Sequence, residues 1–161
     1  MARTKSINFP NSSELETPLD KLQRFATNQV LNTGGLAIKT SSSALAKTVN
    51  TVYYFVDGAL KSKAAADMAA LSGTLPNGGK AVWVFTVTAD GTLASHASNL
   101  DATTVAGITF PTIPDGEVVI GFIVVENGTG SNFVGGTTAL DAASLTVTYI
   151  NTTYPVLPSL S

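Results

Sequence analysis

The sequence contains no cysteine, so the chain forms no disulfide bond and offers no thiolate to a metal ion or to a substrate. It has a single histidine, His96, which leaves no histidine pair for a metal site. No stretch approaches the roughly 18 consecutive apolar residues that indicate a membrane span. The first residues, MARTKSINFP, lack the apolar run of a secretory signal. We therefore expect a protein that is made in the cytoplasm, has no disulfides and does not enter a membrane.

Charged residues are also scarce, at 12% of the chain against about 25% in ordinary soluble domains. Residues 1–80 hold all nine lysines and arginines and five acidic residues, a net charge of +4, whereas residues 81–161 hold six acidic residues and no basic one. Two interpretations fit this asymmetry. Either less of the second half meets water, or the first half of one copy faces the second half of its neighbour. No basic patch is interleaved with aromatic residues, so we expect no nucleic-acid partner.

The composition changes along the chain in a way that predicts three regions. Residues 1–35 read as an N-terminal arm followed by a helix, residues 36–154 as one β-domain, and residues 155–161 as a C-terminal tail. The first 16 residues are polar and have no period, which predicts an extended arm.

A short helix is expected directly after the arm. Thr17 is a favourable N-cap and Pro18 suits the first helical position. Apolar residues at 19, 22, 25, 26 and 30 share one helical face, and Gly34 can end the helix. This pattern predicts about three helical turns.

From residue 36 the sequence alternates short apolar runs with turn residues, which predicts antiparallel strands. Candidate strands cover 36–40, 44–49, 51–57, 59–63, 80–88, 92–97, 105–110, 117–126 and 144–151. The phrases YYFVDGALKS and FTVTADGTLAS each read as a hairpin with an Asp-Gly turn, and the alanine-rich residues 64–73 as a helical interlude. The predicted fold is mainly β, an antiparallel β-sandwich of jelly-roll-like type with an N-terminal extended arm and a short helix.

The motifs of common enzymes are missing from the sequence. No G-x-S-x-G accompanies His96, which we interpret as a solvent-facing strand residue. The glycines of LPNGGKAVWVF lack the spacing of a phosphate loop, and the Asp-Gly pairs lack the ligand pattern of a calcium loop. Asp101, Asp115 and Glu117 could still meet as paired carboxylates, although nothing local supports a glycosidase. We expect no enzymatic activity, no cofactor and no metal.

One apolar strand lacks the alternation of a strand that is wetted on one face. Residues 118–125 contain no charged side chain, and only a glycine interrupts the apolar run. One face would pack on the sandwich core and the other on a second layer or a neighbouring copy. The predicted oligomer interface is Val118, Ile120, Phe122 and Val124.

Several long phrases resemble a group of proteins encoded by tailed bacteriophages. These phrases are YYFVDGALKSKAAADMAALSGT, VWVFTVTADGTLA and FPTIPDGEVVIGFIVVENGTGSNFVGGTTALDAA, together with a late TVTYINT, and they span roughly residues 50–151. By analogy with trimeric β-sandwich cement proteins, the resemblance implies a virion structural protein of capsid decoration type. It further implies a homotrimer on the capsid surface whose partner is the major capsid protein.

The arm is the region expected to contact the capsid or a neighbouring copy. Arg3 and Lys5 supply positive charge, and Ile7 and Phe9 supply apolar anchors. Two alternatives remain. A carbohydrate- or receptor-binding sandwich of a phage fibre would need Trp83, Tyr53 and Tyr54 exposed together on one face, and a small hydrolase would need catalytic groups brought together by the fold.

Overall fold

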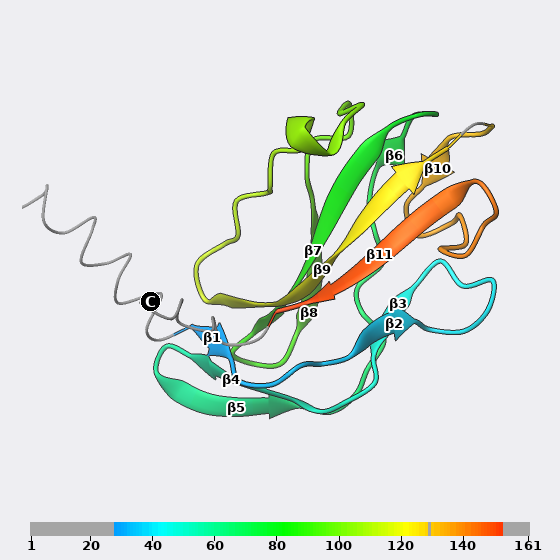
Figure 1. Ribbon diagram of the computed structural model, residues 1–161. Coiled ribbons are helices and arrows are strands. Elements are labelled where there is room, and N and C mark those ends of the chain that lie inside the picture. The colour runs from blue at the N-terminus through cyan, green and yellow to red at the C-terminus, as the bar shows by residue number, and fades with distance from the viewer. Residues whose placement is uncertain (1–27, 129, 153–161) are drawn as a thin grey trace, which may run out of the picture.

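A computed structural model describes residues 28–128 and 130–152, which form an antiparallel β-sandwich (Figure 1). Its strands are β1 (Gln29–Val30), β2 (Leu36–Ile38), β3 (Ala46–Thr48), β4 (Val52–Val56), β5 (Ala59–Lys63), β6 (Thr74–Leu75), β7 (Lys80–Thr88), β8 (Leu93–Ala97), β9 (Glu117–Asn127), β10 (Phe133–Val134) and β11 (Leu145–Asn151). The larger sheet has the order β11-β9-β7-β8 and the smaller sheet the order β1-β4-β5, while β2–β3 and β6–β10 form short pairs. The mainly β, antiparallel fold expected from the sequence is confirmed.

The core lies between the two sheets and is filled by large side chains from both. Trp83 and Phe85 enter it from β7, and Tyr54 enters from β4. Trp83 packs edge-on against Phe133 with ring centroids 5.5 Å apart, and its indole N–H donates to the Ser72 carbonyl at 3.0 Å. The tryptophan is a core anchor, as its position on an apolar strand predicts.

Both Asp-Gly hairpins form where the sequence predicts them. In β4–β5, Val56 pairs with Ala59 across a two-residue turn in which both Asp57 and Gly58 have positive φ, at 50° and 74°. That turn type matches the twist of the strands that it joins, and it favours Asp-Gly. The β7–β8 hairpin is closed by a longer turn in which Gly91 takes the positive φ, at 83°.

A β-bulge in β9 explains why this strand does not alternate. Phe85 pairs with Gly121 but Thr86 pairs with Val119, so Ile120 is an extra residue opposite β7. An extra residue shifts the faces on either side of it by one position. Side chains that are two apart in the sequence therefore point to different faces across the bulge.

Several expectations about local structure are wrong. The helix predicted up to Gly34 cannot extend that far, because Gln29–Val30 form strand β1 and Val30 lies in the core. The remainder of the predicted helix, residues 17–27, lies outside the described residues. The sandwich accordingly begins before the expected residue 36. Residues 105–110, expected as a strand, contain a short 3-10 helix, η1 (Val105–Gly107).

The alanine-rich segment 64–73 is extended instead of helical. Its backbone bonds the neighbouring strand β3: the Thr48 amide donates to the Ala66 carbonyl, and the Met68 amide to the Ala46 carbonyl, both at 2.9 Å. Met68 and Leu71 are buried. Pairing with β3 and burial of these two side chains override the helix propensity of alanine.

Two partly or fully buried tyrosines predict a loss of stability at alkaline pH. Burial, and secondarily the negative charge of Asp90, raise the pKa of Tyr54, while burial and Asp141 raise the pKa of Tyr149. Unfolded tyrosine ionises near its usual pKa of about 10 while the folded side chains keep their protons. The stability that these two tyrosines contribute should be fully present below about pH 10 and should be lost as pH rises through their folded pKa values.

Urea unfolding at about pH 8 and about pH 11 measures this loss, because the first pH is below the ordinary tyrosine pKa and the second is above it. We expect the double variant Tyr54→Phe/Tyr149→Phe to lose less stability between the two conditions than the parent. An equal loss in both proteins would show that other groups cause the alkaline destabilisation.

Candidate interaction surfaces

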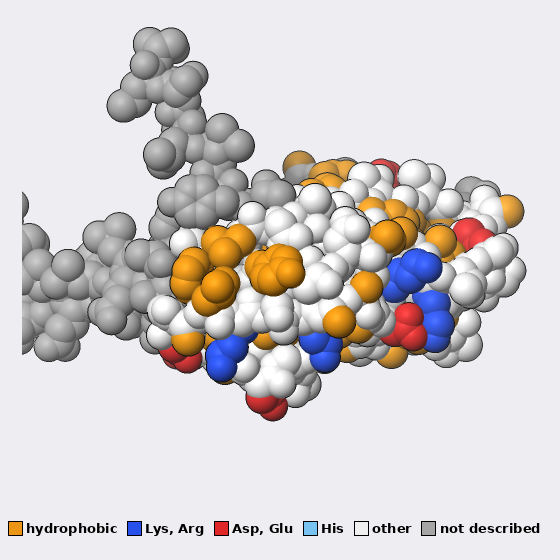
Figure 2. Space-filling view, turned by 90° about the horizontal axis from the view of Figure 1, so that it is seen from below, with side chains coloured by type: hydrophobic (Ala, Val, Ile, Leu, Met, Phe, Trp, Pro, Cys, Tyr) orange, Lys and Arg blue, Asp and Glu red, His pale blue; other side chains and the backbone are white. Residues whose placement is uncertain are grey.

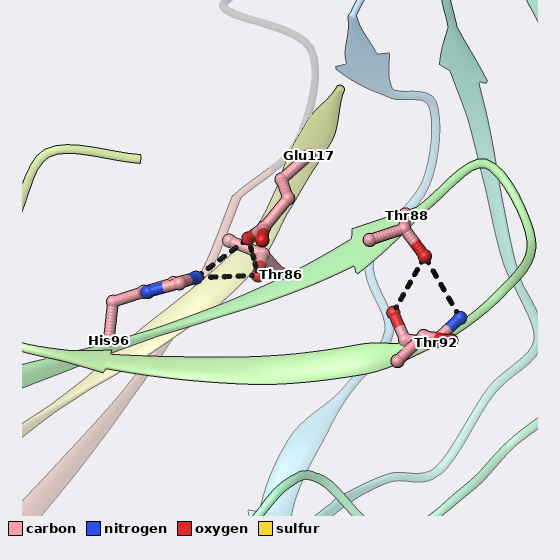
Figure 3. Close-up of polar contacts among 5 residues, drawn as sticks. All are labelled: Thr86, Thr88, Thr92, His96 and Glu117. Atoms are coloured by element: carbon pink, nitrogen blue, oxygen red, sulfur yellow. Dashed lines mark hydrogen bonds and ion pairs between the residues drawn. The ribbon is translucent and has the colours of Figure 1, made fainter. Parts of the chain in front are cut away.

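Three polar side chains on the outer face of the larger sheet bond one another, and one of them is His96, the only histidine in the sequence. Thr86 comes from β7, His96 from β8 and Glu117 from the start of β9 (Figure 3). The Nε2 atom of His96 lies 2.7 Å from Glu117 Oε2 and 3.2 Å from Thr86 Oγ1, and the Thr86 hydroxyl donates to the same Glu117 oxygen. One carboxylate oxygen thus joins three strands.

This arrangement does not match a catalytic triad. A triad places the histidine between the acid and the hydroxyl and uses a different ring nitrogen for each. Here one nitrogen, Nε2, faces both groups, and Glu117 contacts the hydroxyl directly. Thr86 is 0% exposed, so its hydroxyl cannot reach a substrate. His96 lies on the outer face of strand β8, as the sequence predicts, but it is only about one-quarter exposed because it is bonded to Glu117.

Removing the carboxylate should destabilise the larger sheet. Glu117→Ala leaves the buried Thr86 hydroxyl and His96 Nε2 without their acceptor, and we expect the free energy of unfolding to fall by about 1–3 kcal/mol. Thr86→Val is the matched control, because it removes the hydroxyl and keeps the shape. In a double-mutant cycle measured by urea unfolding, the two losses should sum to more than the loss in the double variant. A Glu117→Ala variant as stable as the parent would contradict a structural role.

The carboxylate of Asp90, in one of the Asp-Gly turns, serves local structure. Asp90 accepts hydrogen bonds from the Thr88 hydroxyl and from the amide and hydroxyl of Thr92, and these bonds lower its pKa. Thr88 and Thr92 also bond each other across the turn (Figure 3). Within residues 28–128 and 130–152, no group of three or more acidic or histidine side chains could hold a metal ion.

The aromatic side chains that a sugar-binding platform would need are not brought together. Trp83 and Tyr54 are buried in the core, while Tyr53 is 50% exposed on the outer face of the smaller sheet. Of the three side chains considered for a fibre-type site, only Tyr53 is available to a ligand.

The bulge separates the four residues expected to form an oligomer interface. Val118 and Ile120 point into the core and are buried. Phe122 and Val124 lie beyond the bulge on the outer face of the larger sheet and are half-buried. The part of the expected interface on Val118 and Ile120 is therefore wrong for this fold, because the extra residue changes which face each side chain occupies. Arg3, Lys5, Ile7 and Phe9 lie outside the described residues.

Apolar side chains gather around Phe122 on that outer face. Ile150 is directly opposite Phe122 on β11, and the ring of Phe110 packs edge-on against the Phe122 ring at 5.3 Å. Phe110 is 56% exposed although it is aromatic. We call Phe110, Phe122, Val124 and Ile150 the large-sheet patch. Large contiguous apolar patches mark interaction sites, so this group is a candidate contact surface.

A second apolar surface lies on the outer face of the smaller sheet. Phe55 and Leu60 are directly opposite each other on β4 and β5, and Leu31 is bonded through its amide to the Tyr53 carbonyl at 2.8 Å. Figure 2 shows apolar side chains gathered over the end of the molecule where β1, β4 and β5 lie in Figure 1. We call Leu31, Tyr53, Phe55 and Leu60 the small-sheet patch.

The charge asymmetry of the sequence is weaker in space. Lys61 and Lys63 lie on β5 at positions that pair with the core-facing Tyr54 and Val52, and Figure 2 shows both basic and acidic side chains on the side of the molecule that carries the small-sheet patch. The segment 98–126, which contributes Phe110, Phe122 and Val124 to the large-sheet patch, contains four acidic residues and no basic one, but Glu126 is paired with Lys80 of β7. The two apolar surfaces therefore do not lie in surroundings of clearly opposite charge.

Among the described residues, no helix has the length and apolar character needed to cross a membrane. Comparisons of the chain with models of protein families, with curated proteins and with solved structures found no match.

Proposed function

We propose that this chain is a virion structural protein, a capsid decoration or cement subunit that binds the major capsid protein and assembles with copies of itself. The observation that carries the proposal is the exposure of large apolar side chains on the outer face of the larger sheet. Phe110 is 56% exposed and Ile150 is 36% exposed. Fully burying a side chain of this size stabilises by about 1.5–3 kcal/mol, and a partner that covers these two would recover the exposed share of that free energy.

Self-association is proposed through the large-sheet patch. Phe122 and Val124 are the two predicted interface residues that face outward, and Ile150 extends the same surface onto β11. A heterologous contact, in which this patch meets a different surface of the next copy, forms a ring where the rotation between copies closes. The specific number three comes from the resemblance to trimeric cement proteins.

Light scattering at micromolar concentration tests this assembly. The chain should show about three times the 16.5 kDa mass of one copy. Phe122→Asp and Ile150→Asp should shift the mass to that of the monomer, because a buried unpaired carboxylate opposes the contact. Val134→Asp is the control, since Val134 is exposed on β10 outside both patches. A parent protein that scatters only as a monomer would exclude a stable oligomer.

The capsid-binding role is proposed for residues 1–16, with the sandwich facing outward. Extended at about 3.3 Å per residue, this arm could span roughly 50 Å, well beyond the sandwich itself. A variant lacking residues 1–16 should keep the circular dichroism spectrum and melting cooperativity of the parent. Its binding to particles that lack the protein should fall at least tenfold, while a variant lacking residues 155–161 binds normally.

Quantification in purified particles separates this role from the alternative. A decoration subunit should occur on the head in a fixed ratio to the major capsid protein. Location at a fibre tip would instead support the carbohydrate- or receptor-binding alternative. If the protein without residues 1–16 decorated particles as well as the full chain, the capsid contact would have to lie on the sandwich.

A further inference from the structure

The small-sheet patch has a feature that the large-sheet patch lacks, because the chain enters the sandwich beside it. Asn28 accepts a hydrogen bond from the Asp57 amide at 2.7 Å, which fixes the start of β1 at the tip of the β4–β5 hairpin. Gln29 then pairs with Phe55, a member of the patch. Whatever precedes Asn28 in the chain therefore starts next to Phe55 and Leu60.

The segment immediately before this point has the pattern of an amphipathic helix. Leu19, Leu22 and Phe25 recur at three-residue spacing, and Asp20 and Arg24 fall on the opposite helical face. β1 begins at Gln29, so only the part of the pattern before Asn28 can be helical. An amphipathic helix of two to three turns is marginal in water unless its apolar face is packed.

We infer that the segment 17–25 forms a helix whose apolar face covers the small-sheet patch of the same chain. Nine helical residues span about 14 Å, and the five residues of β4 span about 17 Å, so the helix matches the sheet that it would cover. Residues 26–28 remain as the connection, and three residues are an ordinary length for a link between a helix and a strand. This inference concerns packing within one copy and does not depend on the proposed virion role.

Charge supports the helix itself. The chain reaches β1 at the hairpin tip, so the beginning of the helix lies over the opposite end of the sheet, where Lys63 pairs with Val52. Glu14, Glu16 and Asp20 are at or before that end of the helix. Acidic residues at a helix N-terminus stabilise the helix through its dipole. The edge strand β5 carries Lys61 and Lys63, which oppose the pairing of a further strand there.

A second copy of the chain is the competing occupant of the patch. The short connection favours the segment of the same chain, because a tether of three residues holds it near the patch at a high effective concentration. Covering the patch in this way leaves the large-sheet patch as the apolar surface open to other copies. With the helix in this position, residues 1–16 would start at the end of the smaller sheet where Lys63 lies, which is opposite the hairpin tip.

Engineered disulfides test the inference cleanly, because the chain has no cysteine of its own. The test pair is Phe25→Cys with Leu60→Cys, both near the hairpin tip. The control pair is Arg24→Cys with Leu60→Cys, which places the first thiol on the opposite helical face. Under mild oxidation at low protein concentration, the test pair should form an intramolecular disulfide at least tenfold faster than the control pair. Equal rates, or crosslinks only between two chains, would overturn the inference.

Limited proteolysis of an uncrosslinked variant provides a second measurement. Lys21 and Arg24 are trypsin sites within the segment, and Leu60 is 60% exposed, so Leu60→Asp should leave the sandwich folded. Cleavage at Lys21 and Arg24 should become at least tenfold faster in Leu60→Asp than in the parent, with lower helical ellipticity at 222 nm. Val134→Asp is the matched control and should cleave as the parent does. Unchanged cleavage in Leu60→Asp would overturn the inference.

Discussion

Replacing Trp83 by alanine is expected to lower the free energy of unfolding by about 3–5 kcal/mol. The side chain is fully buried at the centre of β7, packs edge-on against Phe133 and donates its indole N–H to the Ser72 carbonyl. The variant loses the transfer free energy of the ring, leaves a cavity between the sheets and removes the contact with Phe133. Because domains of this size are stable by only about 5–15 kcal/mol, a substantial unfolded fraction should appear at moderate temperature.

Trp83→Phe separates packing from hydrogen bonding at this position. Phenylalanine keeps an aromatic ring against Phe133 and removes the indole donor, and Ser72 is exposed, so water can satisfy its carbonyl. We expect this variant to lose less than half of the stability that Trp83→Ala loses. Thermal unfolding followed by circular dichroism gives both values. Equal losses would show that the hydrogen bond, and not the packed volume, dominates at this site.

Adding a single methyl group at Gly121 is expected to cost about 1–3 kcal/mol, because tightly packed sites accept no additional volume. A Cβ atom at this position would lie 2.5 Å from the Ile150 carbonyl oxygen and 2.6 Å from Leu36 Cδ1. The first of these is a backbone atom of the neighbouring strand, so it cannot rotate away. Gly121→Ala should therefore push β11 away from β9, and Gly121→Val should prevent their normal pairing.

Gly107→Ala is the matched control for this effect. Gly107 has no positive φ, and its nearest neighbours to an added Cβ would be Thr104 Oγ1 at 3.4 Å and Ala102 Cβ at 3.8 Å, ordinary contact distances. Urea unfolding should give a midpoint close to that of the parent for Gly107→Ala and a clearly lower midpoint for Gly121→Ala. Similar midpoints for the two variants would mean that β9 and β11 adjust without cost.

The elements that the sequence predicts correctly are those specified by neighbouring residues. The sequence predicts β7 with the limits that the structure shows. It also predicts the β4–β5 hairpin, because a two-residue turn of this type needs positive φ and Asp57-Gly58 readily adopts it. Segments whose structure depends on distant partners are missed. β1 has only two residues and exists because it pairs with β4, and residues 64–73 follow β3 against their own helix propensity.

For the candidate surfaces, the sequence predicts which strand carries apolar residues on both faces but not which residue lies on which face. Apolar character on both faces of β9 agrees with the structure, in which one face lies in the core and the other carries Phe122 and Val124; what covers that outer face stays a prediction. The assignment of single residues fails at Ile120, because the bulge is created by pairing with β7 and leaves no local pattern. The contact between His96 and Thr86 could have been found, since β7 and β8 form a predicted hairpin whose register makes these residues diagonal neighbours. Glu117 joins them only through the fold.

The order β11-β9-β7-β8 has a consequence for aggregation during folding. β9 follows β7 in the chain but needs β11 to protect its other edge, and β11 arrives only after residues 128–144 have been placed. Until then, β9, whose residues 118–125 carry no charge, presents unpaired amides and carbonyls along one edge. Uncharged strands of high β-propensity with free edges are the segments through which chains join into cross-β aggregates. Refolding yield should therefore decline as the protein concentration rises, and the time that β11 takes to dock sets how steeply it declines.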